Sequence, residues 1–382
     1  MIHNPQNAEE VRDLVAGALA GGTKLEIRGG GTRADFGAPN RQADLLCLRS
    51  LSGVLDYDPA ELVLTARAGT LLAEVQAEVA ARGQALAFEP WGQTGSTLGG
   101  VIAAGVAGPR RVSAGAARDH LLGFAAVSGR AELFRAGAKV VKNVTGYDLP
   151  KLVCGSWGRL VALTEVTLKV LPRPLERVTL LWRGLADEQA FSLMRAALRQ
   201  PADVAAAAHC PGTYTLIRLD GFGPSIAARR AYLVKALASY GSPEVLGETD
   251  AARLWGALEG GAALPVDLPL WRLSLPPRQA LAAIAPLLAF GGQYLADWGG
   301  GLVWLALAGH EAEIRRRAIL AGGHATLVRA PVAMRAWVPA LHPQSAAIEA
   351  LSRRVRRAFD PLGVFETNRF LDVQDQDAQD AN

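Results

Sequence analysis

The part of the sequence that most constrains the fold is residues 139–172, where a polar loop, a glycine turn and a long apolar run follow one another. Between Val161 and Val170 the residues alternate between two faces, and the β-branched composition is typical of a strand. Gly155 and Gly158 precede this run, and residues without a side chain let a backbone approach a ligand closely. The pattern predicts a strand with a glycine-lined entry to a cofactor cleft, and a hairpin corner that requires positive φ is the alternative.

The composition indicates a folded, globular chain with more than one domain. The 382 residues are 50% hydrophobic and 20% charged, which suits a large buried core, and the length favours two or three domains. The net charge of +4 is too small to predict nucleic-acid binding. The 3 cysteines form no CxxC pair and the 6 histidines form no HxH or HxxxH pair, so no disulfide framework, iron–sulfur site or metal site is expected.

No stretch of the sequence predicts a membrane span or a signal peptide. Every apolar run is interrupted by a charge, a glycine or a proline before it reaches membrane-spanning length. Residues 1–20 instead have the pattern of an acidic amphipathic helix, with Asn7 as its capping signal and the pair Gly21-Gly22 as its stop. We therefore expect a cytoplasmic protein.

A strand predicted at residues 24–28 runs into a group of glycines. Gly29, Gly31 and Ala34 match the dinucleotide-binding pattern GxGxxA, but their context excludes a Rossmann unit. Such a unit needs a helix that opens at the glycines, and residues 33–39 (RADFGAP) cannot continue as one. We expect instead a loop whose backbone N–H groups form an anion-binding nest, and a tight turn without a ligand is the alternative.

Two α+β units in series are predicted in the first half of the chain. Short strands are expected at residues 44–48, 53–57 and 62–68, followed by a helix that Thr70 caps. Residues 89–111 are rich in glycine and alanine and could pass close beneath a flat ligand, although a tightly packed core helix would have the same composition. A hairpin is expected with strands at 121–128 and 131–135 and a turn at Gly129.

The second half is predicted to repeat one order of elements. Residues 177–240 follow the order β-α-β-β-α, and residues 270–328 follow β-α-β-β-α-β, which suggests an internally duplicated ferredoxin-like pair. Beyond it, Ile348, Leu351 and Val355 are expected to form the inner face of a helix whose arginines are solvated.

Several motifs together resemble the FAD-binding domain of the vanillyl-alcohol oxidase, or PCMH-type, flavoproteins. They follow the order of that superfamily: RGGGT (28–32), STLGG (96–100), AAG (103–105), RDHLLG (118–123), KNVTGYD (142–148) and TE (164–165). Within it, AGPRR (107–111) and KNV (142–144) are similar to the family of E subunits of bacterial glycolate oxidase, also called glycolate dehydrogenase. The resemblance covers residues 24–174 and the C-terminal DPLGVF (360–365).

The resemblance implies an α+β fold in which a two-subdomain PCMH-type FAD-binding domain carries an α+β cap domain. The expected divisions are the FAD-binding domain (1–174), the cap (175–332), a segment that returns to the FAD-binding domain (333–370) and a disordered acidic tail (371–382). In the superfamily the cap carries the substrate pocket.

Four residues of the expected cap are candidates for lining such a pocket: Trp271, Arg272, Trp298 and Trp304. Tryptophan on a sheet is more often a core residue, which is the competing interpretation.

The cofactor implied by the resemblance is FAD. It should be held without a covalent bond, because Thr32 stands where covalently flavinylated members often carry a histidine. The backbone amides of residues 29–32 would hold the pyrophosphate, and residues 155–158 with Val161 would bound the adenine. The cofactor-binding residues implied are Arg28, Gly29, Gly30, Gly31, Thr32, Ser96, Thr97, Gly99, Gly100, Ala103, Ala104, Gly105, Lys142, Asn143, Tyr147, Asp148, Gly155, Ser156, Gly158, Val161, Thr164 and Glu165.

Two motifs depart from the superfamily pattern. The common GSEGTLG turn is GSWGRLV at residues 155–161, and the usual FNPGR is FETNR at residues 365–369. These departures leave the side-chain contacts of Trp157, Arg159 and Glu366 open.

The resemblance implies an FAD-binding subunit of a complex that oxidises glycolate, a 2-hydroxy acid, to glyoxylate. Its partners would be a catalytic flavoprotein subunit and an iron–sulfur subunit, and the complex could attach it peripherally to the inner membrane. The alternatives are a self-sufficient FAD-dependent oxidoreductase with its own hydroxy-acid site in the cap, and a flavin-free scaffold. In the family, the cap of the paired dehydrogenase subunit carries a histidine-rich metal cluster, and this sequence has no HxH pair to match it.

The polar loop that precedes the long apolar run contains one further candidate. We expect Lys142 to lie near the flavin ring, where a cation raises the reduction potential, and Asp148 to fix that lysine or Tyr147. The alternative is a turn that caps itself through Asn143 and Asp148.

Overall fold

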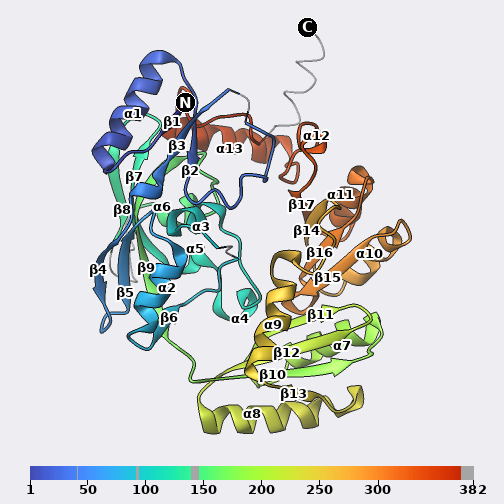
Figure 1. Cartoon of the computed structure of the whole chain (residues 1–382). Coiled ribbons are helices and arrows are strands. Elements are labelled where there is room, and N and C mark those ends of the chain that lie inside the picture. The colour runs from blue at the N-terminus through green and yellow to red at the C-terminus, as the bar shows by residue number, and fades with distance from the viewer. Residues whose placement is uncertain (41, 92–93, 139–145, 371–382) are drawn as a thin grey trace.

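The computed structural model describes residues 1–40, 42–91, 94–138 and 146–370. Two sheets lie in the first half of the chain, and a third, larger sheet lies in the second half (Figure 1). The C-terminal stretch, red in Figure 1, returns to the blue N-terminal part. Within the described ranges, no helix has both the length and the apolar character that crossing a membrane requires.

A small parallel sheet and one helix begin the fold. Asn7 accepts a hydrogen bond from the N–H of Glu10 at 2.8 Å, and Gly22 ends the helix in a left-handed conformation, so both predicted ends are confirmed. Val11 and Val15 of the helix pack onto the sheet. The helix is α1 (Ala8–Gly21), and the sheet has the order β1 (Ile2–His3), β3 (Asp44–Cys47), β2 (Leu25–Arg28).

The second sheet is built around the long strand that the alternation at residues 161–170 predicted. Its order is β4 (Val54–Asp58), β5 (Val63–Arg67), β9 (Val161–Pro172), β7 (Leu121–Ser128), β8 (Leu133–Gly137), and β6 (Gln84–Leu86) also pairs with β9. The predicted hairpin is confirmed as β7 and β8. The helices of this region are α2 (Leu72–Ala80), α3 (Leu98–Ala104), α4 (Arg111–Ala114), α5 (Ala117–His120) and α6 (Leu149–Val153).

Two local predictions for this half can be checked directly. No helix follows β2 at the glycines, where turns continue through residue 36, so the exclusion of a Rossmann unit is confirmed. The prediction that Thr70 caps a helix is wrong. Its hydroxyl donates to the carbonyl of Arg67 at 2.7 Å and fixes the turn after β5, and α2 begins at Leu72.

The third sheet has eight strands and consists of two halves with the same topology. In each half the first strand lies between the third and the fourth, and the halves meet where β11 pairs with β15. This is the duplicated ferredoxin-like arrangement that the repeated element order predicted. The first half is β10 (Glu176–Arg183), α7 (Asp187–Leu198), β11 (Val204–Cys210), β12 (Tyr214–Gly221), α8 (Gly223–Ala236) and β13 (Glu244–Leu246). The second half is β14 (Leu270–Ser274), α10 (Ala280–Leu288), β15 (Gln293–Asp297), β16 (Leu302–Ala306), α11 (Glu311–Leu320) and β17 (His324–Arg329).

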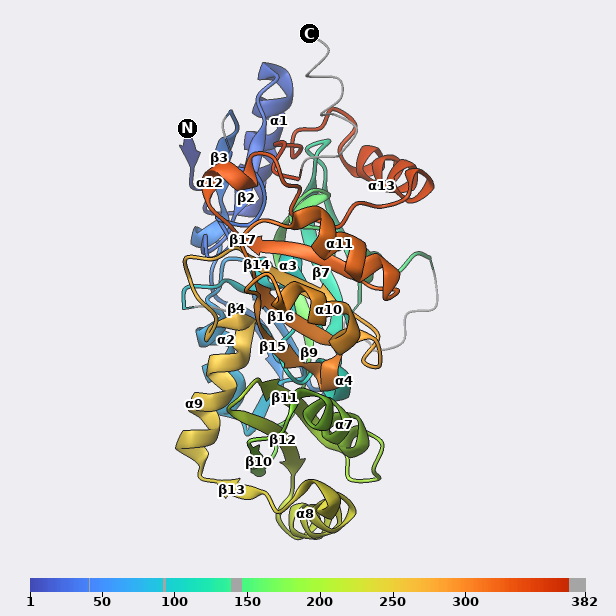
Figure 2. The same cartoon turned by 90° about the vertical axis from the view of Figure 1, so that its right-hand side faces the viewer.

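The two faces of this sheet have different neighbours. Helices α7, α8, α10 and α11 bury one face in the largest apolar core, on the side away from the first half of the chain (Figures 1 and 2). The other face, with Trp304 and Leu295, points towards the first half and packs with Trp91. Helix α9 (Glu248–Leu258), which the sequence analysis missed, contributes Trp255 to this second face.

The C-terminal segment first packs on the cap, where the N–H of Leu327 in β17 donates to the carbonyl of Ala340 at 2.8 Å, and then returns to the first half of the chain. The N–H of Leu25 in β2 donates to the carbonyl of Val364 at 2.8 Å, and Phe365 is buried in the core beneath β2. The expected inner face of α13 (Ala346–Phe359) is wrong at its N-terminal end. Ile348 and Leu351 are 48% and 51% exposed, because only the C-terminal turns of α13 reach the core of the second sheet.

Candidate cofactor cleft

A cleft of about 880 Å³, its open mouth included, lies where the glycine loop after β2 meets the start of α3. Its lining residues come from seven separate stretches of the chain: Ile27 to Ala34, Leu48, Ala68, Trp91, a group between Ser96 and Ala104, a group between Trp157 and Leu163, and Arg369.

The glycine loop can occupy its place only because it lacks side chains. A Cβ on Gly29 would stand 2.1 Å from Oγ1 of Thr97, and a Cβ on Gly30 would stand 1.8 Å from the carbonyl oxygen of Gly95. Gly31 has φ +74°, a conformation that favours glycine. Within the described chain, the amides of residues 29–32 donate to no backbone acceptor, which leaves them available to an anion.

The opposite wall of the cleft is the start of α3. Thr97 caps this helix by accepting from the N–H of Gly100 at 3.3 Å. A Cβ on Gly99 would lie 2.7 Å from Cβ of Ala68, so this glycine lets α3 approach β5 closely. The hydroxyl of Thr32 lies 3.1 Å from that of Ser96 and joins the glycine loop to this wall.

Three arginines line the cleft, and its described lining contains no carboxylate. Arg28 pairs with the buried Glu26 at 2.9 Å, and Arg369 lies 3.7 Å from the same carboxylate. Arg33 stacks on the ring of Trp91, with its Cζ 3.8 Å from the ring centroid. Burial lowers the pKa of Arg33 to about 10, so this guanidinium is still a cation at neutral pH.

The structural features fit FAD. Open amides and arginines suit a pyrophosphate, and the apolar side chains of Ile27, Leu48 and Val161 suit a flat ring system. Bound FAD would supply two-electron redox chemistry, with the amides of residues 29–32 holding its pyrophosphate.

The structure gathers thirteen of the predicted site residues at this cleft: Arg28, Gly29, Gly30, Gly31, Thr32, Ser96, Thr97, Gly99, Gly100, Ala103, Ala104, Gly158 and Val161. Others lie outside its lining. Gly105 and Gly155 pack backbone against backbone, since a Cβ on Gly105 would stand 2.9 Å from Cα of Gly155. The neighbouring Ser156 donates its N–H to the carbonyl of Val153 at 3.1 Å and so belongs to a turn.

Tyr147 and Asp148, the described residues predicted in the polar loop, do not line the cleft. Tyr147 is 93% exposed, and Asp148 caps α6 and pairs with Lys151 at 2.6 Å, which is the self-capping alternative. Lys142 and Asn143 lie outside the described residues.

Two predicted residues belong to β9 instead of the cleft. Glu165 pairs with Arg135 across the sheet at 2.8 Å, and Thr164 is buried with its carbonyl accepting from the N–H of Ala68.

Sequence reasoning missed four larger side chains of the lining: Arg33, Trp91, Trp157 and Arg369. Trp157 has φ +57° and stacks on Phe36 with the ring centroids 4.0 Å apart. The departure at residues 155–161 was a signal for Trp157, which stands where the pattern has a glutamate, and Arg369 is a residue that FETNR shares with the FNPGR pattern. Arg159, also left open, pairs with Glu366 at 3.0 Å.

The candidate pocket residues of the cap do not line this cleft. Trp271 is fully buried on the helix-covered face, and Trp304 packs edge-on against Trp91, so the core interpretation holds for both. Trp298 donates to the carbonyl of Gly108 at 3.0 Å, and the guanidinium of Arg272 lies 5.0 Å from the Trp298 ring.

The fold and the cleft define an FAD-binding protein of the PCMH type, and comparison with known proteins agrees. Residues 1–137 match the family model described as an FAD binding domain. Over 375 residues the chain is 35% identical to glycolate oxidase subunit GlcE of Escherichia coli (strain K12), covering 97% of this chain and 99% of the relative. The chain therefore belongs to the GlcE family and is an FAD-linked oxidoreductase.

More distant similarities agree with this family. Glycolate oxidase subunit GlcD of Bacillus subtilis (strain 168) is 26% identical over 295 residues, which cover 74% of this chain and 61% of the relative. A D-2-hydroxyglutarate dehydrogenase of Xanthomonas citri pv. viticola is 35% identical over 201 residues, covering 51% of this chain and 42% of the relative. A solved structure of alkyldihydroxyacetonephosphate synthase has a TM-score of 0.69 at 15% identity, covering 95% of this chain and 76% of that chain, and shows a shared fold.

Proposed function

We propose that this protein is the FAD-carrying subunit of a glycolate oxidase complex, which oxidises glycolate to glyoxylate. The observation that carries the proposal is the end-to-end similarity to a protein named as a subunit of glycolate oxidase, at 35% identity over 97% of this chain. A glycine-walled, arginine-lined cleft in the matching region supports it. In this role the chain accepts and releases electrons beside a catalytic flavoprotein subunit and an iron–sulfur subunit.

The chain's own residues would bind FAD in three ways. The open amides of residues 29–32 would hold the pyrophosphate, with Arg28 and Arg369 neutralising its charge. The small residues at the start of α3 would let the cofactor pass close to the backbone. The apolar side chains of Leu48 and Val161 would exclude water from one end of the cleft.

The cofactor is held without a covalent bond in this proposal. Thr32 stands at the loop position where flavoproteins with covalently attached FAD often carry a histidine, and its hydroxyl lies 3.1 Å from that of Ser96. A threonine hydroxyl is also a poor nucleophile at its ordinary pKa.

The proposed division of the chain keeps 1–174 as FAD-binding domain, 175–332 as cap and 333–370 as the returning segment. The hydrogen bond between Leu25 and Val364 supports the return.

A comparison of the purified chain with the reconstituted complex tests the function. We expect the chain alone to show a flavin spectrum but no glycolate:dye activity, and the activity to appear when the catalytic and iron–sulfur subunits are added. Glycolate turnover by the chain alone would support the self-sufficient alternative. A purified chain that takes up no FAD would refute both.

A further inference from the structure

The side of the cofactor cleft that borders the cap is formed by two side chains in direct contact. The guanidinium of Arg33 lies flat over Trp91, with Cζ 3.8 Å from the ring centroid. Its Nη2 also donates to the carbonyl oxygen of Trp91 at 2.8 Å. The Trp91 ring also packs edge-on against Trp304 of the cap, with the ring centroids 4.9 Å apart. The position of Arg33 therefore depends on where Trp91 stands.

Arg33 differs electrostatically from the other two arginines of the cleft. Arg28 and Arg369 share the buried carboxylate of Glu26 at 2.9 and 3.7 Å. Within the described ranges no carboxylate lies at ion-pair distance from Arg33, and Glu259 acts on it only from farther away. A half-buried cation without a close counter-ion exerts its field on whatever occupies the cleft beside it.

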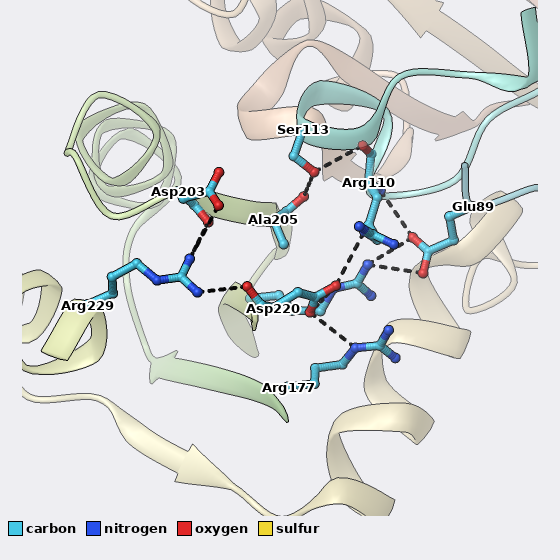
Figure 3. A network of polar contacts seen from close by, with 9 residues as sticks. Glu89, Arg110, Ser113, Arg177, Asp203, Ala205, Asp220 and Arg229 are labelled. Atoms are coloured by element: carbon cyan, nitrogen blue, oxygen red, sulfur yellow. Dashed lines mark hydrogen bonds and ion pairs between the residues drawn. The ribbon is translucent and has the colours of Figure 1, made fainter. Parts of the chain in front are cut away.

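A network of charges from the cap fixes the backbone that carries Trp91 (Figure 3). Glu89, two residues before Trp91, accepts from Nη2 of Arg218 with both carboxylate oxygens at 3.0 Å. Arg218 lies on β12 and its side chain is 3% exposed. The N–H of Arg110 also donates to Glu89, and the side chain of Arg110 pairs with Asp220 of β12 at 3.3 Å.

The network ties to the cap two segments that already pair with each other, since the N–H of Gly108 donates to the carbonyl of Glu89 at 2.8 Å. Ser113 donates to the carbonyl of Ala205 in β11 at 2.7 Å, and Arg177 of β10 pairs with Asp220 at 3.2 Å (Figure 3). Strands β11 and β12 of the cap therefore hold residues 89–91 and 108–113 of the first domain, and with them the cap side of the cleft, while Arg177 of β10 supports Asp220 from within the cap.

We propose that Arg33, held on Trp91 by the cap through the Glu89–Arg218 pair, is a cation that raises the reduction potential of the bound flavin. The inference rests on the proposed electron-carrying function. Two-electron reduction adds negative charge to the flavin ring, and a neighbouring cation stabilises that charge. The redox ring must exchange electrons with a partner, so we place it beside Arg33 and Trp91, where the cleft borders the cap, and we place the adenine beside the apolar side chains of Leu48 and Val161.

Potentiometric titration of the FAD-loaded chain tests the role of Arg33. R33Q keeps a donor for the Trp91 carbonyl but removes the charge, so reduced FAD should bind about tenfold more weakly relative to oxidised FAD, which is about 30 mV lower in midpoint potential. R33K keeps the charge, so its midpoint potential should stay close to that of the wild type. R12Q, which removes an exposed charge on α1, should leave the potential unchanged. A wild-type potential in R33Q overturns the inference and leaves the proposed function intact.

The E89A variant tests the role of the cap independently, with Arg33 still present. If Glu89 acts on the flavin directly through its charge, removing its carboxylate should raise the midpoint potential. If Glu89 instead holds Trp91 and Arg33 in place, their release should lower the midpoint potential, and this is the result we expect. An unchanged or raised potential in E89A contradicts positioning by the cap, even if R33Q retains too little FAD to be titrated. Failure of the wild-type chain to bind FAD would instead refute the proposed function.

Discussion

The place that a Cβ of Gly30 would occupy lies 1.8 Å from the carbonyl oxygen of Gly95. The glycine loop and the segment before α3 therefore touch backbone to backbone, and the cofactor cleft depends on that contact.

We predict that Gly30→Ala separates these two walls and weakens FAD binding. Overpacking of a close contact costs about 1–3 kcal/mol, and 1.4 kcal/mol is about tenfold in affinity. Gly30→Asp should abolish binding, because a carboxylate about 4 Å from a phosphate repels it by roughly 4 kcal/mol at an effective dielectric near 20. Gly17→Ala in α1 is the matched control, since its Cβ would meet nothing within 4 Å. Fluorescence titration of the apoproteins with FAD measures all three, and full flavin occupancy in Gly30→Asp would place the phosphate elsewhere.

A second prediction concerns the pH dependence of stability at Asp297, which is 3% exposed. Burial, with a contribution from Glu89, raises the pKa of this carboxyl to about 7 against the opposing effects of the Trp298 N–H, Arg218 and Arg272. The unfolded chain has an ordinary pKa near 3.9, so folding takes up a proton between about pH 4 and pH 7. The contribution of Asp297 to the free energy of unfolding is thus complete below pH 4 and is lost as the pH rises through 7.

Urea unfolding between pH 5 and pH 8 checks this. The free energy of unfolding of Asp297→Asn, which mimics the protonated acid, should vary less with pH than that of the wild type and should resemble it most closely at pH 5. Equal pH dependence in both proteins would show that Asp297 does not titrate in this window.

The C-terminal return gives a third prediction. Asp360, which is 4% exposed, accepts from the N–H groups of Val364 and Phe365 at 2.8 Å each. Asp360→Ala leaves both donors unpaired, so we expect a loss of about 2 kcal/mol or more in the free energy of unfolding. FAD affinity should fall as well, because Arg369 of this segment lines the cleft. Asp250→Ala on α9 removes an exposed pair and should change stability by less than about 0.5 kcal/mol. Equal effects of the two substitutions would contradict the account.

The lysine of the polar loop remains a separate prediction. Lys142→Met keeps the apolar stem and removes the charge, so it should leave FAD bound and lower the flavin potential, by about 30 mV for each 1.4 kcal/mol lost. Asp148 is already engaged by Lys151, so it is not needed to hold Lys142. A wild-type midpoint potential in Lys142→Met would make the loop a simple turn.

The parts of the fold that local patterns determine could be predicted from the sequence. The alternation at residues 161–170 predicted β9, and the repeated element order predicted the two halves of the third sheet. Helix α9 has its buried residues at helical spacing, Ala251, Leu254, Trp255 and Leu258, so its signal was present and was overlooked. The exposure of Ile348 could not be predicted, because an amphipathic pattern does not say whether a core lies beneath the helix.

The residues of the cleft likewise fall into those that a local pattern could predict and those that it could not. Its glycine loop and the start of α3 are visible as glycine-rich motifs, since close approach of backbones requires that residue. Arg369 and Leu48 reach the cleft from distant parts of the chain, and no local pattern reports such a meeting. The stacking of Arg33 on Trp91 likewise depends on the Glu89–Arg218 contact across 129 residues of sequence.

The measurement that most directly tests the central claim is the fate of the yellow colour when the purified chain is denatured with acid. The account predicts that the native chain has a flavin spectrum and that all of the flavin passes to the supernatant as FAD, because the cleft holds it through backbone amides and arginines. Colour that stays with the precipitated protein would contradict non-covalent binding. A colourless chain that takes up no added FAD would contradict the claim as a whole.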